Sequence, residues 1–170
     1  KRFSGHTNWV TQMKFSDDDA DLYSLSLDAT IRSWHVDDAS SSLVIDLSNE
    51  SNVAVFDLIE SDDRIICGHQ DGTVSLKSTV DGQTVLSSPI FFNSVNGLVV
   101  PVDSGIAFIT SAESDVITCL NNRSLEVICR LETNTDGILG LKLDRSSRRL
   151  HVLHSNGEIQ IINLITPVGS

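Results

Sequence analysis

The chain has 170 residues, 40% of them hydrophobic, and a formal net charge of −11 at pH 7. This length allows one compact domain with a sizeable core, and the acidic balance argues against binding to nucleic-acid phosphates or to anionic membranes. No apolar run approaches the roughly 18 residues that a membrane span needs, so we expect no membrane as a partner. Nucleic acid is disfavoured as a partner because of the acidic charge.

Three cysteines, Cys67, Cys119 and Cys129, are too few and too scattered to form a disulfide framework. We expect them to be buried thiols within strands, because free cysteine packs as a small hydrophobic residue. This use of cysteine indicates an intracellular protein of the cytoplasm or the nucleus. The chain begins at Lys1 rather than methionine, so we interpret it as an excerpt of a longer protein or a processed piece.

The apolar residues occur in short runs that are bounded by Asp, Ser, Asn and Gly, with almost no helical periodicity. This pattern is typical of an all-β chain of strands and turns. The strands expected in chain order are 9–15, 22–27, 30–36, 43–47, 53–59, 64–68, 73–78, 84–88, 95–100, 105–110, 116–120, 126–131, 138–143, 149–153 and 158–164.

A turn followed by a strand recurs at nearly constant spacing. The four copies are Asp28-Ala29-Thr30-Ile31, Asp71-Gly72-Thr73-Val74, Glu113-Ser114-Asp115-Val116 and Asn156-Gly157-Glu158-Ile159, at intervals of 43, 42 and 43 residues. A period of roughly 40–45 residues with four short strands is typical of a propeller blade. We therefore predict a β-propeller of four-stranded antiparallel blades. The single segment 1–170 is expected to hold about four of them, at approximately 5–48, 49–90, 91–133 and 134–166.

The first unit carries the most specific motif. Gly5-His6 precedes its first expected strand, Asp28 lies in the turn between its second and third strands, and Trp34 stands near the end of the third. These residues resemble a WD repeat, the blade sequence of WD-repeat β-propellers, with His35 where the family usually has Asp. The resemblance covers the whole chain by period, but only residues 5–36 by specific motif.

The resemblance implies a buried hydrogen-bonded set of His6, Ser24 (or Ser26), Asp28 and Trp34. In such a set the histidine bonds both the aspartate and the hydroxyl, and the hydroxyl faces the indole N–H, so every buried polar group has a partner. The alternative interpretation is a His–Ser–Asp catalytic triad. A triad needs an exposed nucleophile beside an oxyanion site, whereas these positions belong to the inside of a blade.

The later units depart from the motif. Asp71-Gly72 keeps the turn, but Lys77 stands where the tryptophan would be. The dipeptide Gly68-His69 looks like the Gly-His of the family but falls just before the turn. We therefore expect His69 to be a loop residue rather than part of a hydrogen-bonded framework. The third and fourth units lack the motif's His, its Trp and, in register, its Asp.

Four blades do not by themselves show how the ring of the propeller closes. Propellers carry roughly 4–8 blades, and WD-repeat proteins most often close with seven. We expect this chain to be part of a larger propeller of the seven-bladed type, with further blades from another segment or chain, because an open arc exposes unpaired edges and apolar faces. Alternatively, Lys1-Arg2-Phe3 completes the last blade and closes a four-bladed ring.

Partners of WD-repeat propellers often bind the face built by the loops between blades and between the second and third strands. Trp9 is the strongest candidate there, because aromatic anchors dominate interface energetics. The alternative is that Trp9 packs within its own strand or against a neighbouring blade. The residues expected on this loop face are Thr7, Asn8, Trp9, Leu27, Asn52, Gln70, Asn93, Asp136 and Ser155.

Charged residues cluster on the expected hairpins. Arg145, Arg148 and Arg149 form the only basic cluster and are a candidate contact for phosphate or an acidic partner, or simply a charged loop. The acidic runs 17–19, 37–38 and 62–63 are either solvated loops or an acidic patch for a basic partner. They lack the pattern of a calcium loop. The histidines show no common metal spacing, and no phosphate loop or dinucleotide fingerprint is present, so we expect no metal and no cofactor.

The function expected from the sequence is that of a non-catalytic scaffold or adaptor that binds other proteins or peptides within a multiprotein complex. Rigid blades that carry variable loops suit such a role. Two alternatives are a substrate-recognition module of a ubiquitin-ligase complex and an assembly factor of a ribonucleoprotein, for example in ribosome biogenesis. An enzyme on a propeller scaffold is the least expected class.

Overall fold

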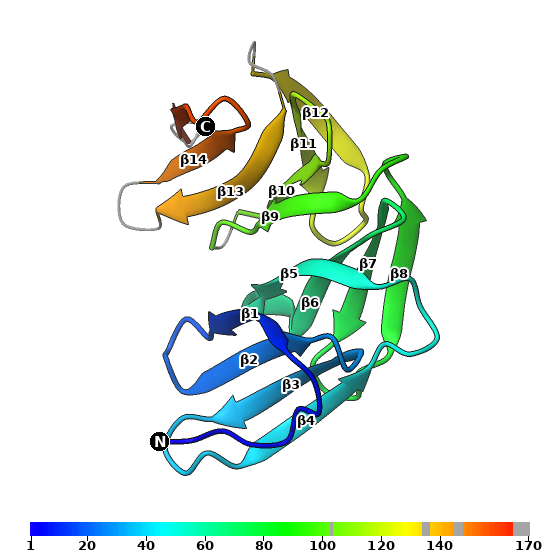
Figure 1. The fold of residues 1–170 in the computed structure, drawn as a ribbon, viewed down its shortest axis with the longest axis vertical. Coiled ribbons are helices and arrows are strands. Elements are labelled where there is room, and N and C mark those ends of the chain that lie inside the picture. The colour runs from blue at the N-terminus through cyan, green and yellow to red at the C-terminus, as the bar shows by residue number, and fades with distance from the viewer. Residues whose placement is uncertain (103, 134–136, 145–147, 165–170) are drawn as a thin grey trace.

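The computed structural model describes residues 1–102, 104–133, 137–144 and 148–164. Its strands form four antiparallel sheets that follow one another along an open arc (Figure 1). Each sheet is built from strands that are consecutive in sequence, as in a meander. The predicted fold class is confirmed: the chain is all-β, and its sheets are the blades of a propeller arrangement.

The strand bounds lie within two residues of those expected from the sequence. The first sheet contains β1 (Val10–Phe15), β2 (Asp21–Ser26), β3 (Thr30–His35) and β4 (Ser41–Asp46). The second contains β5 (Val53–Ile59), β6 (Arg64–His69), β7 (Thr73–Ser78) and β8 (Thr84–Pro89), with the short 3₁₀ helix η1 (Glu60–Asp62) after β5. The third contains β9 (Val95–Val99), β10 (Ile106–Ser111), β11 (Val116–Asn121) and β12 (Val127–Glu132). In the described residues the fourth contains β13 (Ile138–Asp144), β14 (Arg149–His154) and β15 (Ile159–Asn163).

The hydrophobic core is divided among the gaps between neighbouring sheets. Leu25 and Ile31 of the first sheet pack against Phe56 and Ile65 of the second, and similar clusters join the second sheet to the third and the third to the fourth. Alternation along each strand therefore gives every inner sheet two apolar faces, one for each neighbour. In residues 1–102, 104–133, 137–144 and 148–164, no helix is long and apolar enough to cross a membrane.

The recurring turns have left-handed residues at their ends. Ala29, Gly72 and Gly157 have φ values of 61°, 84° and 88°, each immediately before the third strand or one residue earlier. In the third sheet the left-handed residue is instead Glu113, with φ 61°, and β11 begins three residues later. The spacing places this turn correctly, because Ser114 N–H donates to the Ser111 carbonyl oxygen at 3.3 Å as Ala29 N–H donates to that of Ser26 at 3.2 Å. Only the left-handed residue lies one position earlier in the third unit.

The N-terminal segment lies on the first sheet. Lys1 Nζ donates a hydrogen bond to the Val36 carbonyl oxygen at 2.9 Å, and the Phe3 and Trp34 rings meet edge to face at 6.1 Å. Lys1-Arg2-Phe3 therefore contacts the first blade rather than completing the last one, which counts against closure of a four-bladed ring by this segment.

One cysteine prediction is wrong. Cys67 and Cys119 are buried as expected, but Cys129 is exposed. It lies on β12, the outermost strand of the third sheet, directly opposite Cys119. Outermost strands have only one sheet neighbour, so residues there keep more contact with solvent. Burial raises the pKa of the Cys67 thiol to about 12, so that residue is not a reactive nucleophile.

Candidate interaction surfaces

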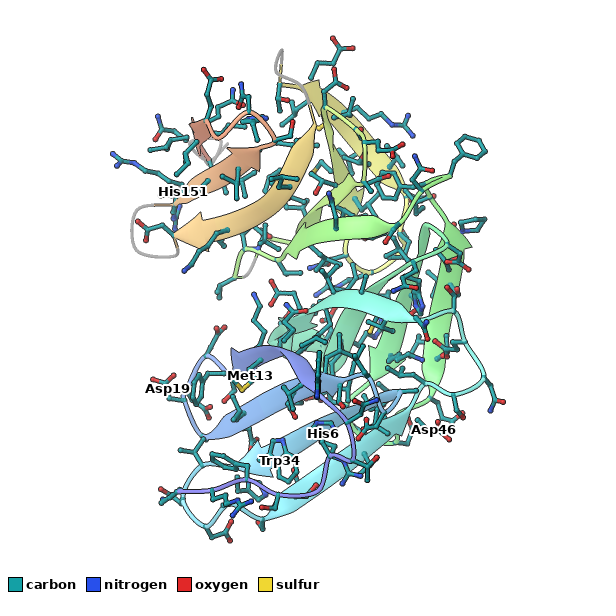
Figure 2. All side chains as sticks on the ribbon, viewed as in Figure 1. His6, Met13, Asp19, Trp34, Asp46 and His151 are labelled. Carbon is teal, nitrogen blue, oxygen red and sulfur yellow. The ribbon has the colours of Figure 1, made fainter. Side chains whose placement is uncertain are left out.

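The first sheet contains a connected set of polar side chains, of which Figure 2 labels His6 and Trp34. His6 Nδ1 lies 2.9 Å from Asp28 Oδ2, and His6 Nε2 lies 2.7 Å from Ser24 Oγ. Trp34 Nε1 donates to Ser24 Oγ at 2.8 Å. Because a carboxylate only accepts, Nδ1–H donates to Asp28 and Nε2 accepts from the Ser24 hydroxyl. Ser26 is not a member: its hydroxyl donates to the Asn8 carbonyl oxygen at 3.2 Å.

Asp28 is held as a carboxylate in this set. Burial raises its pKa, but hydrogen bonds from the Thr30 hydroxyl, the Thr7 N–H and His6 outweigh that effect and hold the pKa well below its ordinary value. The Ser24 hydroxyl is buried and already bonded on both sides. It therefore lacks the exposure that a nucleophile of a catalytic triad requires, and the set supports the turn beside the loop face.

Asp28→Ala should lower the free energy of unfolding by about 1–3 kcal/mol, because it leaves buried donors unsatisfied. The pKa of Asp28 is depressed in the folded state, so its contribution is present above pH ~4 and is lost as pH falls below the unfolded value. Urea unfolding at pH 7 and at pH 3 measures both effects. The exposed Glu132→Ala is the control, and equal unfolding of wild type and Asp28→Ala at pH 7 would contradict the prediction.

A second polar cluster lies in the second sheet and corrects the expectation for His69. His69 is buried at the end of β6, where Nε2 lies 2.7 Å from Ser75 Oγ and Nδ1 lies 2.7 Å from the Ser51 carbonyl oxygen. His69 is therefore part of a hydrogen-bonded framework. It belongs to strand β6, whereas His6 of the first sheet lies in the segment before β1. The sequence comparison aligned His69 only with the Gly-His position of His6. It therefore did not predict a buried histidine at the end of the second strand.

Lys77 occupies the position of the tryptophan and is only 1% exposed. Its Nζ donates to Glu50 Oε1 at 2.5 Å and to Thr84 Oγ1 at 2.9 Å. The Thr84 hydroxyl also donates to Glu50 Oε1 at 2.9 Å. An ion pair between the buried Lys77 and Glu50, whose side chain is 28% exposed, thus replaces the indole at this site, and the aliphatic stem of the lysine fills part of its volume.

The residues expected on the loop face are exposed, as far as they are described. Trp9 is 79% exposed and its backbone N–H donates to Asn8 Oδ1 at 2.8 Å, while Leu27 N–H donates to the Trp9 carbonyl oxygen. Asp136 lies outside the described residues. The other members, Thr7, Asn8, Leu27, Asn52, Gln70, Asn93 and Ser155, are all exposed. Trp9 is therefore not packed within its strand in this chain.

The charged residues that the sequence analysis singled out do not form one site. Arg148 and Arg149 are exposed, and Arg145 lies outside the described residues. Among the residues that the structure describes, no three His, Cys, Asp or Glu side chains lie close enough together to hold a metal ion. Asp62 is paired with Arg123, whose Nε and Nη2 donate to its carboxylate at 2.6 and 2.9 Å.

Both ends of the arc leave an apolar blade face uncovered. In the third strand of each sheet, Ile31, Val74 and Ile117 are 0% exposed, whereas Ile159 of the last sheet is 65% exposed. In the first strand, Phe56 of the second sheet is 0% exposed, whereas Met13 of the first sheet is 62% exposed (Figure 2). Met13 pairs with Ser24 as Phe56 pairs with Cys67, so the two occupy equivalent positions.

The sequence matches no protein-family model and no curated protein. Solved structures share its fold. The crystal structure of the computationally designed Ika4 protein matches with a TM-score of 0.74 and 17% identity over 96% of each chain. The crystal structure of RRP9 WD40 repeats matches with a TM-score of 0.73 and 15% identity, covering 95% of this chain and 53% of that one. The structure of U3-55K matches with a TM-score of 0.72 and 14% identity, covering 95% of this chain and 54% of that one.

Proposed function

We propose that this chain is one part of a WD-repeat type of propeller and acts as a non-catalytic protein-interaction scaffold. The observation that carries the proposal is the pair of uncovered blade faces. Ile159 and Ile161 are 65% and 52% exposed, although their counterparts in the inner sheets are buried. Met13 and Phe15 are likewise 62% and 52% exposed at the other end. Apolar patches of this kind mark interaction surfaces.

Further blades from another segment or chain are the partners that fit these faces. Each face repeats the chemistry by which the blades of this chain already pack on one another, so a blade-like sheet is its natural complement. The overlap with RRP9 and U3-55K structures about twice as long agrees with a larger propeller, whereas the designed Ika4 protein is matched over 96% of its own length. Once the ring is completed, the loop face around Trp9 is the surface proposed for binding partner proteins or peptides.

Native mass spectrometry of the protein purified gently from its source cells tests this proposal. The expected result is a larger, defined species in which additional chain covers the open faces. Ile159→Asp combined with Ile161→Asp should disrupt that species, because each buried isoleucine contributes about 1.5–3 kcal/mol to packing. Val80→Asp, an exposed residue outside both faces, is the control. A lone 18.5 kDa species in the wild type would overturn the proposal.

The ubiquitin-ligase and ribonucleoprotein alternatives also concern assemblies, and both remain predictions. The ribonucleoprotein alternative has a direct test in the basic hairpin. Salt-sensitive RNA binding that is lost when Arg145, Arg148 and Arg149 are replaced together would support it. RNA binding unaffected by that change would contradict a contact through these arginines.

A further inference from the structure

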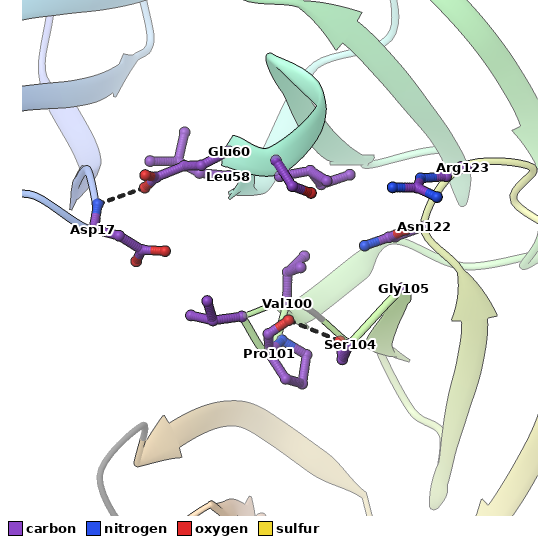
Figure 3. A pocket seen from close by; sticks show the side chains of 12 residues that line it. Asp17, Leu58, Glu60, Val100, Pro101, Ser104, Gly105, Asn122 and Arg123 are labelled. Atoms are coloured by element: carbon purple, nitrogen blue, oxygen red, sulfur yellow. Dashed lines mark hydrogen bonds between the residues drawn. The ribbon is translucent and has the colours of Figure 1, made fainter. Parts of the chain in front are cut away.

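A pocket of about 520 Å³ opens between blades on the face opposite to the loop face (Figure 3). Its walls come from the hairpin after β1, from the end of β5 and η1, from residues 100–102 and 104–105, and from the connection between β11 and β12. The lining includes Asp17, Glu60, Val100, Val102, Asn122 and Arg123.

The acidic side of the pocket is formed by Asp17 and Glu60. Glu60 Oε1 accepts a hydrogen bond from the Asp17 backbone N–H at 2.6 Å, which fixes the carboxylate at the pocket wall (Figure 3). Burial, followed by the nearby carboxylates of Asp18, Asp57 and Asp21, raises the pKa of Glu60. The one cation on the lining, Arg123, is already held by Asp62. Among the described residues Glu60 has no cationic partner, so a positive group would complement its carboxylate.

Asn122 provides an independent sign that a ligand belongs here. Its side chain extends into the pocket (Figure 3), the residue is only 4% exposed, and its Oδ1 accepts no hydrogen bond from the described residues. An unsatisfied buried acceptor costs about 1–3 kcal/mol. Rotation of the terminal amide exchanges Oδ1 and Nδ2, so the acceptor can be turned toward a donor in the pocket.

Ser61 and Ser104 add polar groups to the remaining wall. Its apolar part consists of Leu58, Ile59, Val100, Pro101 and Val102. A long basic side chain combines an aliphatic stem for such a wall with a charged head for the acidic side. A guanidinium group presents five N–H donors in a rigid plane, enough for a carboxylate and an amide oxygen at once, whereas an ammonium group is a compact point charge.

We infer that this pocket binds an arginine side chain of a partner protein, with the guanidinium donating to Glu60 and Asn122. The inference rests on the proposed function, because an interaction scaffold supplies the partner. The net charge of −11 favours the approach of a basic partner.

Titration of the ¹⁵N-labelled 170-residue chain with acetyl-arginine amide tests the inference by NMR. Amide shifts should saturate and concentrate on Glu60, Asn122 and Val102. Acetyl-citrulline amide, which has the same length but no charge, should cause no such shifts. Glu60→Gln should weaken binding about tenfold or more, as expected for loss of a hydrogen bond to a charged group. Glu132→Gln removes one exposed charge outside the pocket and should leave binding unchanged.

Three results would overturn the inference: equal binding of citrulline, no effect of Glu60→Gln, or shifts spread over the acidic hairpins. Binding of acetyl-lysine amide as tight as that of the arginine probe would overturn the assignment to a guanidinium. These probes are small and do not engage the open blade faces. A negative result in the arginine titration therefore concerns the pocket alone, whereas a negative result in mass spectrometry concerns the proposed assembly.

Discussion

Replacing Glu50 with Ala should lower the free energy of unfolding by about 2–3 kcal/mol. This lies below the range for breaking a fully buried ion pair, because the Glu50 side chain is 28% exposed. Lys77 is almost wholly buried, and Glu50 is its only carboxylate contact among the described residues. Without that carboxylate, the Thr84 hydroxyl is a single neutral partner for a buried charge. Thermal and urea unfolding of the two proteins at pH 7 would measure the loss.

A double-mutant cycle separates the charge from the packing. Lys77→Met removes the charge but keeps most of the apolar stem, so it should cost less than Glu50→Ala. The double variant Glu50→Ala/Lys77→Met should then be more stable than Glu50→Ala alone. If the double variant is the least stable protein of the series, the buried charge is not the cause of the loss.

The pH dependence of this pair has a definite sign. Burial raises the pKa of Glu50, but hydrogen bonds from Lys77 and Thr84 outweigh it and place the pKa below its ordinary value. The carboxylate therefore adds stability above its unfolded pKa of about 4.3, and this contribution is lost as pH falls through the folded value. Glu50→Ala should accordingly differ most from wild type near neutral pH and least in acid.

The sequence predicts the blades well because their signals are local. Alternation, turn residues and a period of 42–43 residues locate every strand within two residues. The pair of Lys77 and Glu50 has no local signal. Lysine is normally an exposed residue, and its partner stands 27 residues away on a connection between sheets. The repeat period shows that Lys77 stands at the position of Trp34 in the first unit, but it does not show that this position is buried in the second unit.

The pocket and the exact turns were beyond sequence reasoning for the same reason. The lining runs from Asp17 to Arg123, because hairpins of three blades meet at one place only after the sheets have stacked. In the third unit, Glu113-Ser114-Asp115 fits the repeat by residue type, yet the left-handed position falls on Glu113. Residue type predicts that a turn is present, but turns that share the same closing hydrogen bond can place the left-handed residue at different positions.

Replacing Gly72 with Ala should destabilise the chain by about 2–4 kcal/mol, from left-handed strain of roughly 1–2 kcal/mol together with overpacking. A Cβ atom at Gly72 would lie 2.3 Å from the Phe91 carbonyl oxygen and 2.7 Å from its carbon. Both are backbone atoms, and the Phe91 N–H also donates to the Gly72 carbonyl oxygen at 3.1 Å. Relief of these contacts would therefore require the backbone at Phe91 to move.

Gly157→Ala is the matched control, because Gly157 ends the equivalent turn with φ 88° and has open space where its Cβ would lie. It should show the conformational strain alone, about 1–2 kcal/mol. Urea unfolding of both variants isolates the contact with Phe91 as their difference, and equal losses would show that this contact has no effect. The Cβ of Gly72→Ala would also lie 2.9 Å from the Asn93 carbonyl oxygen, so this variant should shift the Asn93 amide resonance on the loop face, whereas Gly157→Ala should not.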